Sequence, residues 1–138
     1  MDSHMSKKII IPISPWDNFA QLRSPNGLIT AEITAKEIAL GAPTEGTLKL
    51  TGGTSIEGCN PSMAWSDDSQ YLALPHWTPE RMQRLLVISF KKNMIGFAPG
   101  LFKVLELTNF VRGKIKAVDS PILSPKLIEI NLNEISWE

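Results

Sequence analysis

The chain has 138 residues, and its 14 lysine and arginine residues balance 14 aspartate and glutamate residues, so its formal net charge is zero. This length predicts one domain with a core large enough to need no metal or disulfide. Zero net charge argues against a nucleic-acid partner, because nucleic-acid binding relies on a basic surface that releases counterions. No apolar run in the sequence approaches the roughly 20 residues of a membrane-spanning helix, so we also expect no membrane partner.

The N-terminus and the single cysteine help to define the domain. Residues 1–5, MDSHM, are typical of what remains of a cleaved expression tag, which leaves residues 6–138 as a single β domain. Cys59 is the only cysteine, so no intrachain disulfide forms. We therefore expect a reducing, cytoplasmic location. Nothing nearby in the sequence lowers the pKa of the Cys59 thiol, so we expect it to be structural and inert.

Helical patterns are scarce, and strand patterns recur along the chain. Residues 18–23 are a weak helix candidate, and Thr78 followed by Pro79 predicts a short helix or helical turn with Thr78 as its cap. Alternation of apolar and polar residues, typical of strands with one buried face, recurs elsewhere. It covers residues 29–34, 47–51 and 128–132. Turn residues stand at 25–27 (Pro-Asn-Gly) and 52–53 (Gly-Gly).

Residues 60–90 are the most informative stretch. One apolar segment ends at Trp65, an acidic turn follows at residues 66–69, and a second apolar segment begins at Tyr71. A polar connection then leads to a third apolar segment at residues 85–90. Short apolar segments separated by turn residues predict an antiparallel β-meander.

A faint repeat links this stretch to an earlier one. Residues 24–31, SPNGLITA, align with residues 66–73, SDDSQYLA, at an offset of 42 residues (66 − 24), and both read as a four-residue turn followed by a strand. The motif WSDDSQYLAL resembles the inner hairpin of a β-propeller blade of the Tol-type and tryptophan–aspartate-repeat families, in which a turn of the form S-P-D-G precedes an apolar strand. Ser66, Asp68 and Ser69 match that turn, whereas a third copy near Thr108 has no clear turn.

The length of the chain limits what this resemblance implies. A closed propeller has four to eight blades, and at about 42 residues per blade this chain holds at most about three. We therefore expect a mainly β fold, in which antiparallel meanders pack as a sandwich or a partial propeller-like stack, with at most one or two short helices.

Few residues suggest catalysis. His76 stands alone between Pro75 and Trp77, without a second histidine at the spacing of a metal site, and we expect a loop histidine that packs on Trp77. Asp67 and Asp68 are too closely spaced for a calcium loop but fit a tight turn. We therefore predict no catalytic residue, no metal and no cofactor, and a chain that is not an enzyme.

Two connecting segments carry residue types that are common in protein interfaces. Residues 75–84 form a longer connection than a hairpin needs, and residues 14–23 precede the first turn of the repeat. Tryptophan and arginine are enriched in binding hot spots. The residues that we predict to contact a partner are Trp77, Glu80, Arg81, Arg84, Trp16 and Asp17. Both tryptophans are equally candidates for the core, because large indoles fill small β cores well.

Three functional hypotheses follow. The first is a non-catalytic protein-binding domain, and more narrowly a bacterial immunity protein whose partner is a cognate toxin domain; that narrower hypothesis rests on analogy. The second is a small-molecule or carbohydrate-binding domain or a hydrolase, with Trp77, His76 and Asp17 in one deep pocket. The third is an oligomeric structural module in which an edge strand at residues 126–132 pairs between chains.

Overall fold

The structure, a computed structural model, describes residues 11–138, so the tag remnant at residues 1–5 lies outside the described residues. The chain is mainly β and antiparallel, which confirms the predicted fold class. The first meander contains β1 (Phe19–Arg23), β2 (Thr30–Glu37), β3 (Thr44–Leu50) and β4 (Ser55–Cys59). The second contains β5 (Ala64–Trp65), β6 (Tyr71–Trp77), β7 (Gln83–Ser89) and β8 (Met94–Phe97). The third contains β9 (Leu105–Val111), β10 (Lys114–Asp119) and β11 (Lys126–Asn131). A 3-10 turn, η2 (Leu132–Glu134), then leads to β12 (Ser136–Trp137), which pairs with β8.

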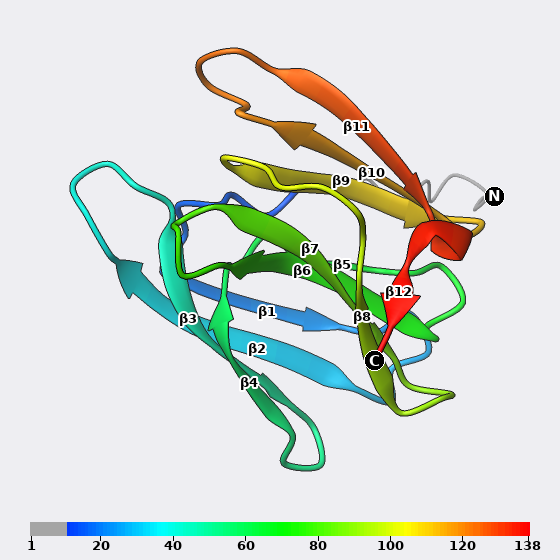
Figure 1. Cartoon of the computed structure of the whole chain (residues 1–138). Coiled ribbons are helices and arrows are strands. Elements are labelled where there is room, and N and C mark those ends of the chain that lie inside the picture. The colour runs from blue at the N-terminus through cyan, green and yellow to red at the C-terminus, as the bar shows by residue number, and fades with distance from the viewer. Residues whose placement is uncertain (1–10) are drawn as a thin grey trace, which may run out of the picture.

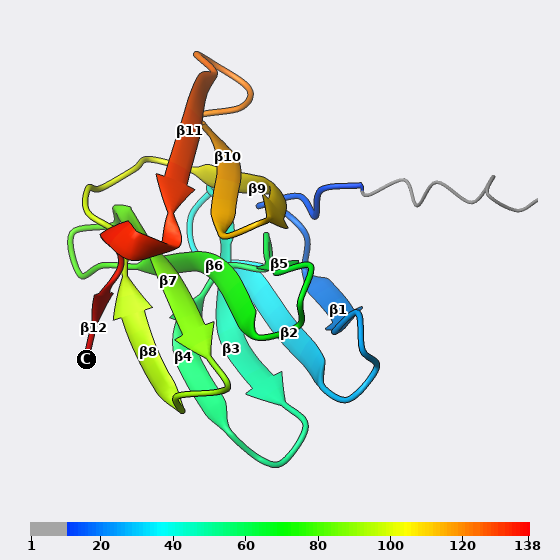
Figure 2. The same ribbon diagram turned by 90° about the vertical axis from the view of Figure 1, so that its right-hand side faces the viewer.

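The three meanders lie as layers, with the second meander in the middle (Figures 1 and 2). The first two belong to one nine-stranded sheet, but a single residue pair, Cys59 with His76, joins β4 to β6. The sheet folds over at this narrow connection, so that the first meander faces the second. The third meander is a separate three-stranded sheet on the opposite side.

The second meander is apolar on both faces because successive side chains of β6 and β7 point to opposite sides. One face packs on the first meander and carries Leu72, Leu74, Leu86 and Ile88. The other face packs on the third meander and carries Ala73, Leu85 and Val87. Leu48 and Ile33 of the first meander and Leu107 and Ile115 of the third are as deeply buried. Two cores therefore share one central layer.

The two turns of the sequence repeat have the same hydrogen bonds. The hydroxyl of Ser24 accepts the N–H of Ile29 at 3.1 Å, and the hydroxyl of Ser66 accepts the N–H of Tyr71 at 2.9 Å. The backbone N–H groups of the same two serines donate to the Ile29 and Tyr71 carbonyls at 2.8 and 2.9 Å. Each serine thus closes its hairpin twice, once with its backbone and once with its side chain.

The remaining positions of the two turns also correspond. The serine hydroxyls donate to Asn26 Oδ1 at 2.7 Å and to Asp68 Oδ1 at 2.6 Å, as expected of turn residues. The fourth residue of each turn, Gly27 or Ser69, has a positive φ of 77° or 64°, the conformation that follows a type I turn in many hairpins. The faint repeat is therefore a repeat of structure as well as of sequence.

Both predicted helices are wrong. Residues 18–23 lie almost entirely in β1, where Ala20 and Leu22 are more buried than the residues next to them, the alternation of a strand with one buried face. Thr78 opens the hairpin turn between β6 and β7, where the Arg81 N–H donates to the Thr78 carbonyl at 3.0 Å and Arg81 has a φ of 63°. Among the described residues, no helix has the length and apolar character that crossing a membrane would require.

The repeated turn gives the first prediction. Replacing Ser66 with alanine removes a hydroxyl that is 2% exposed and makes two hydrogen bonds, so we expect the free energy of unfolding in urea to fall by about 2 kcal/mol. Ser24→Ala should cause a similar loss, because its bonds are the same. Ser55→Ala on the exposed part of β4 is the control. Equal stability of the Ser66 and Ser55 variants would contradict this account of the turn.

Candidate functional site

Three of the six residues predicted to contact a partner come together around Thr44, at the start of β3. The Thr44 hydroxyl donates to the Asp17 carbonyl at 2.6 Å, and the Trp77 indole N–H donates to the Thr44 carbonyl at 3.0 Å. The Trp16 indole N–H donates to the Gly41 carbonyl at 2.9 Å. Both indoles are half-buried. They anchor chain segments to one another and leave part of each ring at the surface.

The other three predicted residues lie apart from this cluster. Glu80 and Arg81 are exposed at the tip of the β6–β7 hairpin. Arg84 pairs across the strands with His76, the neighbour of Trp77 in β6. Because adjacent residues of a strand point to opposite faces, Arg84 and Trp77 project from opposite sides of the sheet. The structure therefore divides the predicted contact residues between two faces and a hairpin tip.

His76 lies in a strand and not in a loop, and its ring faces Phe97, with 6.0 Å between the ring centroids, so the expectation of a loop histidine was wrong. Its Nε2 lies 3.0 Å from the Glu57 carbonyl oxygen, an acceptor, so Nε2 carries the proton. Burial lowers the pKa of His76; the bond to Glu57 opposes that effect, and the nearby Arg84 guanidinium reinforces it. Arg84 itself stacks 3.5 Å above the Phe97 ring centroid.

Cys59, which we expect to be structural and inert, is fully buried. Burial raises the pKa of its thiol to about 12; a backbone hydrogen bond from Leu48 lowers it, and the charge of Glu45 raises it further. The thiol therefore stays protonated at neutral pH. Within residues 11–138, no three His, Cys, Asp or Glu side chains gather in a way that would hold a metal ion.

A groove of about 420 Å³ lies between the first strands of the three meanders and is the candidate site. Its walls are largely apolar. They include Leu22 of β1, Ala64 and Trp65 of β5, and Leu107, Phe110 and Val111 of β9. Ile11, Pro12 and Ile13 also line it, in an irregular segment that precedes β1. Figure 2 shows that β1, β5 and β9 lie on the same side of the molecule as this segment.

The turns of the three meanders are bonded to one another beside this groove. The Asn26 N–H of the first turn donates to the Ser69 hydroxyl of the second at 2.9 Å. The Asp67 N–H donates to the Phe110 carbonyl at 3.1 Å, and Asp67 Oδ1 accepts the N–H of Arg112, in the turn between β9 and β10, at 3.2 Å. Asp67 therefore connects the second meander to the third, in addition to its place in the turn that the sequence predicts.

Two buried polar side chains hold β9 against the middle meander. The Leu105 N–H donates to Gln83 Oε1 at 2.7 Å, and the Leu107 N–H donates to the Ser62 hydroxyl at 3.0 Å. Both side chains are fully buried. Sequence reasoning missed Gln83 and Ser62, although a glutamine that opens an apolar run was a signal that a backbone group needed a partner there.

The groove does not contain the residues of the second hypothesis. Among residues 11–138, Trp77, His76 and Asp17 are absent from its lining, and the titratable side chains in it are Arg23 and Asp67, both close to the turns. Comparison with known proteins adds no relationship, since no protein-family model, curated protein or solved structure matches the chain. The residues of the chain itself therefore carry the functional argument.

The position of His76 gives the second prediction. Because the folded state holds its pKa below the ordinary value of 6.5, the folded state binds fewer protons than the unfolded chain as the pH falls. The stabilising effect of a neutral His76 is thus present above pH 6.5 and lost below it. Between pH 8 and pH 5, urea unfolding should show a larger loss of stability for the natural chain than for His76→Gln. Parallel pH profiles of the two proteins would contradict a lowered pKa.

Proposed function

We propose that this chain is a non-catalytic protein-binding domain that takes an extended, apolar segment of a partner protein into the groove between β1, β5 and β9. The observation that supports this most strongly is the lining of the groove, which offers apolar contact along three strands and few polar groups. A partner bound there buries apolar surface, and that burial drives association.

The position of residues 11–13 supports an extended segment as the occupant of the groove. Residues 11–13, Ile-Pro-Ile, already lie in an irregular segment against its wall. Ile13 packs on the first core, whereas Ile11 is 78% exposed. An extended segment with apolar side chains at alternate positions therefore fits this surface, as in other cases of peptide recognition beside strand edges.

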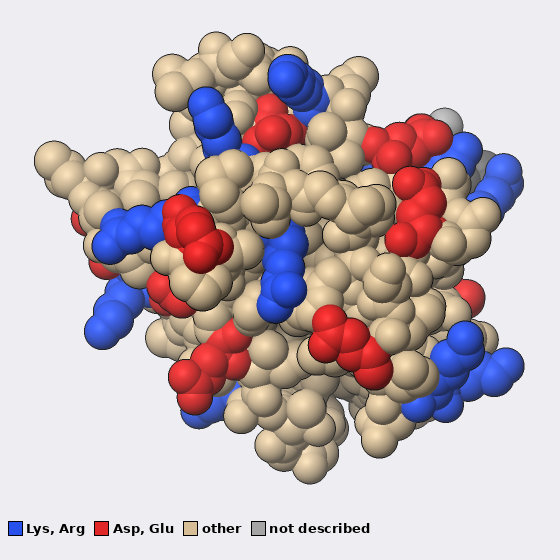
Figure 3. All heavy atoms as spheres, viewed as in Figure 1, with Lys and Arg blue, Asp and Glu red and all other residues tan. Residues whose placement is uncertain are grey.

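The charges near the groove favour a precise orientation over strong attraction. Arg23 and Asp67 stand near one end, close to the turns, and carry opposite charges. One such pair of opposite charges orients a partner more than it accelerates encounter. The opposite face of the molecule, shown in Figure 3, carries interspersed acidic and basic side chains. The narrower hypotheses, a bacterial immunity protein, a toxin partner and a cytoplasmic location, stay predictions.

The groove also favours a second candidate, a binder of small apolar molecules. Its volume of about 420 Å³ lies within the range of ligand pockets. Trp65 is in its wall and packs on Phe90, with 5.2 Å between the ring centroids, which fixes the position of the indole. The sequence suggests Trp16 or Trp77 as the aromatic residue that contacts a ligand. In this second candidate, Trp65 has that role instead.

The third prediction separates these candidates. Selection from a random ten-residue peptide library should enrich sequences with alternating apolar residues. Val111→Glu should then weaken the selected peptides at least about tenfold, or roughly 1.4 kcal/mol in isothermal titration, because it puts a carboxylate in the apolar wall. Val111 is 38% exposed and pairs with Lys114, so the variant should fold normally.

Two controls accompany this measurement. Leu40→Glu makes the same kind of change at a residue that is 98% exposed and outside the lining, and it should leave binding unchanged. The double variant Trp77→Ala, Arg81→Ala tests the surface that the sequence predicts. Loss of binding in the double variant alone would move the site to the β6–β7 hairpin. Enrichment of no peptide, together with saturable binding of apolar fragments, would favour the second candidate.

A further inference from the structure

The edge of β11 differs from the other sheet ends among residues 11–138. At the edge of β1, the Trp65 indole N–H donates a hydrogen bond to the Leu22 carbonyl at 2.9 Å. At β9, Gln83 and Ser62 bind the backbone, and β12 has only two residues. β11 has six residues and pairs with β10 alone. Glu134 Oε2 accepts the Asn131 N–H at the C-terminal end of this edge, and within the described part of the chain the remaining outward backbone groups of β11 are free. A regular edge with free N–H and C=O groups is a template for another strand, and natural proteins usually protect such edges.

The side chains around this edge are unusually apolar for an exposed hairpin. Ile122, Leu123 and Leu127 are 70%, 91% and 88% exposed. They lie in or beside the connection between β10 and β11, a hairpin that projects from the body of the molecule (Figure 2). Ile128 is partly buried against the second core. The free edge and the apolar surface therefore coincide.

The backbone pattern shows which groups are free. The Leu132 N–H donates to the Gly113 carbonyl at 2.9 Å, one pair beyond the Lys114–Asn131 pair of the ladder. Along an antiparallel strand, the backbone N–H and C=O groups of one residue point toward the neighbouring strand, and those of the next residue point away from it. Counting back from Leu132, Ile128 directs its N–H and C=O toward β10, whereas Leu127 and Glu129 direct theirs to the free edge.

We infer that β11 pairs with β11 of a second copy of this chain, antiparallel about a twofold axis at Ile128. In this register, Leu127 and Glu129 of each copy exchange their free backbone hydrogen bonds with Glu129 and Leu127 of the other. An axis at Glu129 would oppose two carboxylates, which destabilises a cross-strand pair. An axis at Leu127 would oppose Glu129 to Pro125, which has no N–H to donate.

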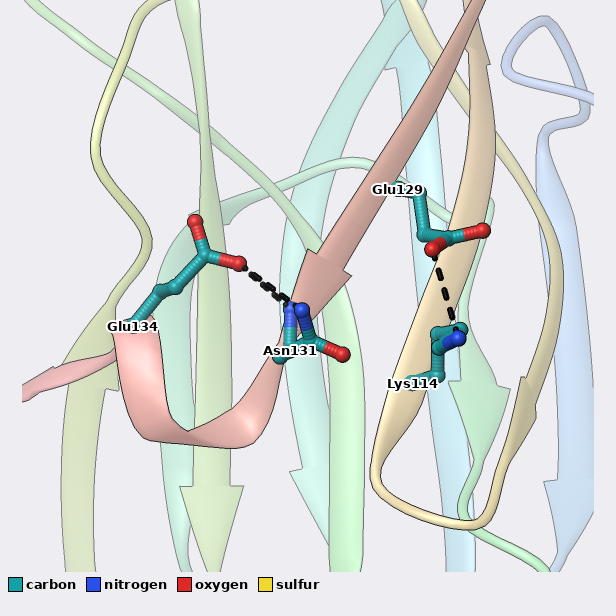
Figure 4. Close-up of polar contacts among 4 residues, drawn as sticks. All are labelled: Lys114, Glu129, Asn131 and Glu134. Atoms are coloured by element: carbon teal, nitrogen blue, oxygen red, sulfur yellow. Dashed lines mark hydrogen bonds and ion pairs between the residues drawn. The ribbon is translucent and has the colours of Figure 1, made fainter.

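Charge and shape agree with a second copy as the occupant. Glu129 already has a partner in its own chain, since its carboxylate lies 3.4 Å from Lys114 Nζ, and Glu134 is bonded to Asn131 (Figure 4). Glu129, which lies in the contact itself, therefore brings no unpaired carboxylate to it. In the same register, the exposed tip at residues 122–124 of one copy reaches η2 of the other, whose Leu132 is partly buried on the second core.

The fourth prediction tests this pairing with single cysteines, and Cys59 does not interfere because it is fully buried. Residues at the twofold axis face each other across a closely spaced pair, a geometry that suits a disulfide. Ile128→Cys should therefore form cross-linked dimers under mild oxidation roughly ten times faster than Leu127→Cys, through its higher effective concentration. Leu40→Cys, at a residue that is 98% exposed, gives the rate of random collision.

Light scattering of the natural chain at several concentrations completes the test. We expect its mass to rise toward that of a dimer with concentration. Leu127→Pro removes an N–H that binds across the contact and none that binds β10, so it should weaken self-association at least about tenfold with an unchanged circular dichroism spectrum. A natural chain that stays monomeric at every concentration, or Ile128→Cys cross-linking no faster than Leu40→Cys, would overturn the inference. The mass of the natural chain and the cross-linking rate of Ile128→Cys do not depend on Leu127→Pro. Both results therefore decide the question even if that variant does not fold.

Discussion

Burial of the second meander on both of its faces is the interaction on which the rest of the structure depends. Leu74 and Leu86 point into one core, while Leu85 and Val87 point into the other, and all four are 1% exposed or less. Burial of apolar surface is the main favourable term in folding. Each outer meander has one apolar face, so each is held in place by the layer that it covers.

This layered arrangement also explains where the binding surfaces lie. The turns at Ser24 and Ser66 place the first strands of successive meanders side by side, and Asp67 adds the third. Three such meanders are too few to close a ring of the kind that propellers form. The groove lies where β1, β5 and β9, the first strands of the three layers, come together, and among residues 11–138 the third layer ends at β11, which pairs with β10 alone. Both proposed contacts therefore lie at the borders of the stacked layers.

The layers and the repeated turn were predictable from the sequence, because alternation and turn chemistry are local signals. Alternation at residues 29–34 and the S-P-N-G and S-D-D-S turns each depend on neighbouring residues. The groove was not predictable, since Leu22, Trp65 and Val111 are far apart in the chain and meet only when the layers stack. Trp77 and Arg84 failed to form one surface for a similar reason: strand geometry, and not sequence spacing, separates them. Thr78 was misread because a cap followed by proline also opens a hairpin turn.

Native-state hydrogen exchange tests the central role of the second meander most directly. If that meander is the shared layer of two cores, the hydrogen-bonded amides of β6 and β7 should exchange most slowly, at the rate set by global unfolding, and those of β1 and β10 should exchange faster. If amides of an outer meander proved the most protected while β6 and β7 exchanged through a smaller opening, the two-sided layer would not be what holds this fold together.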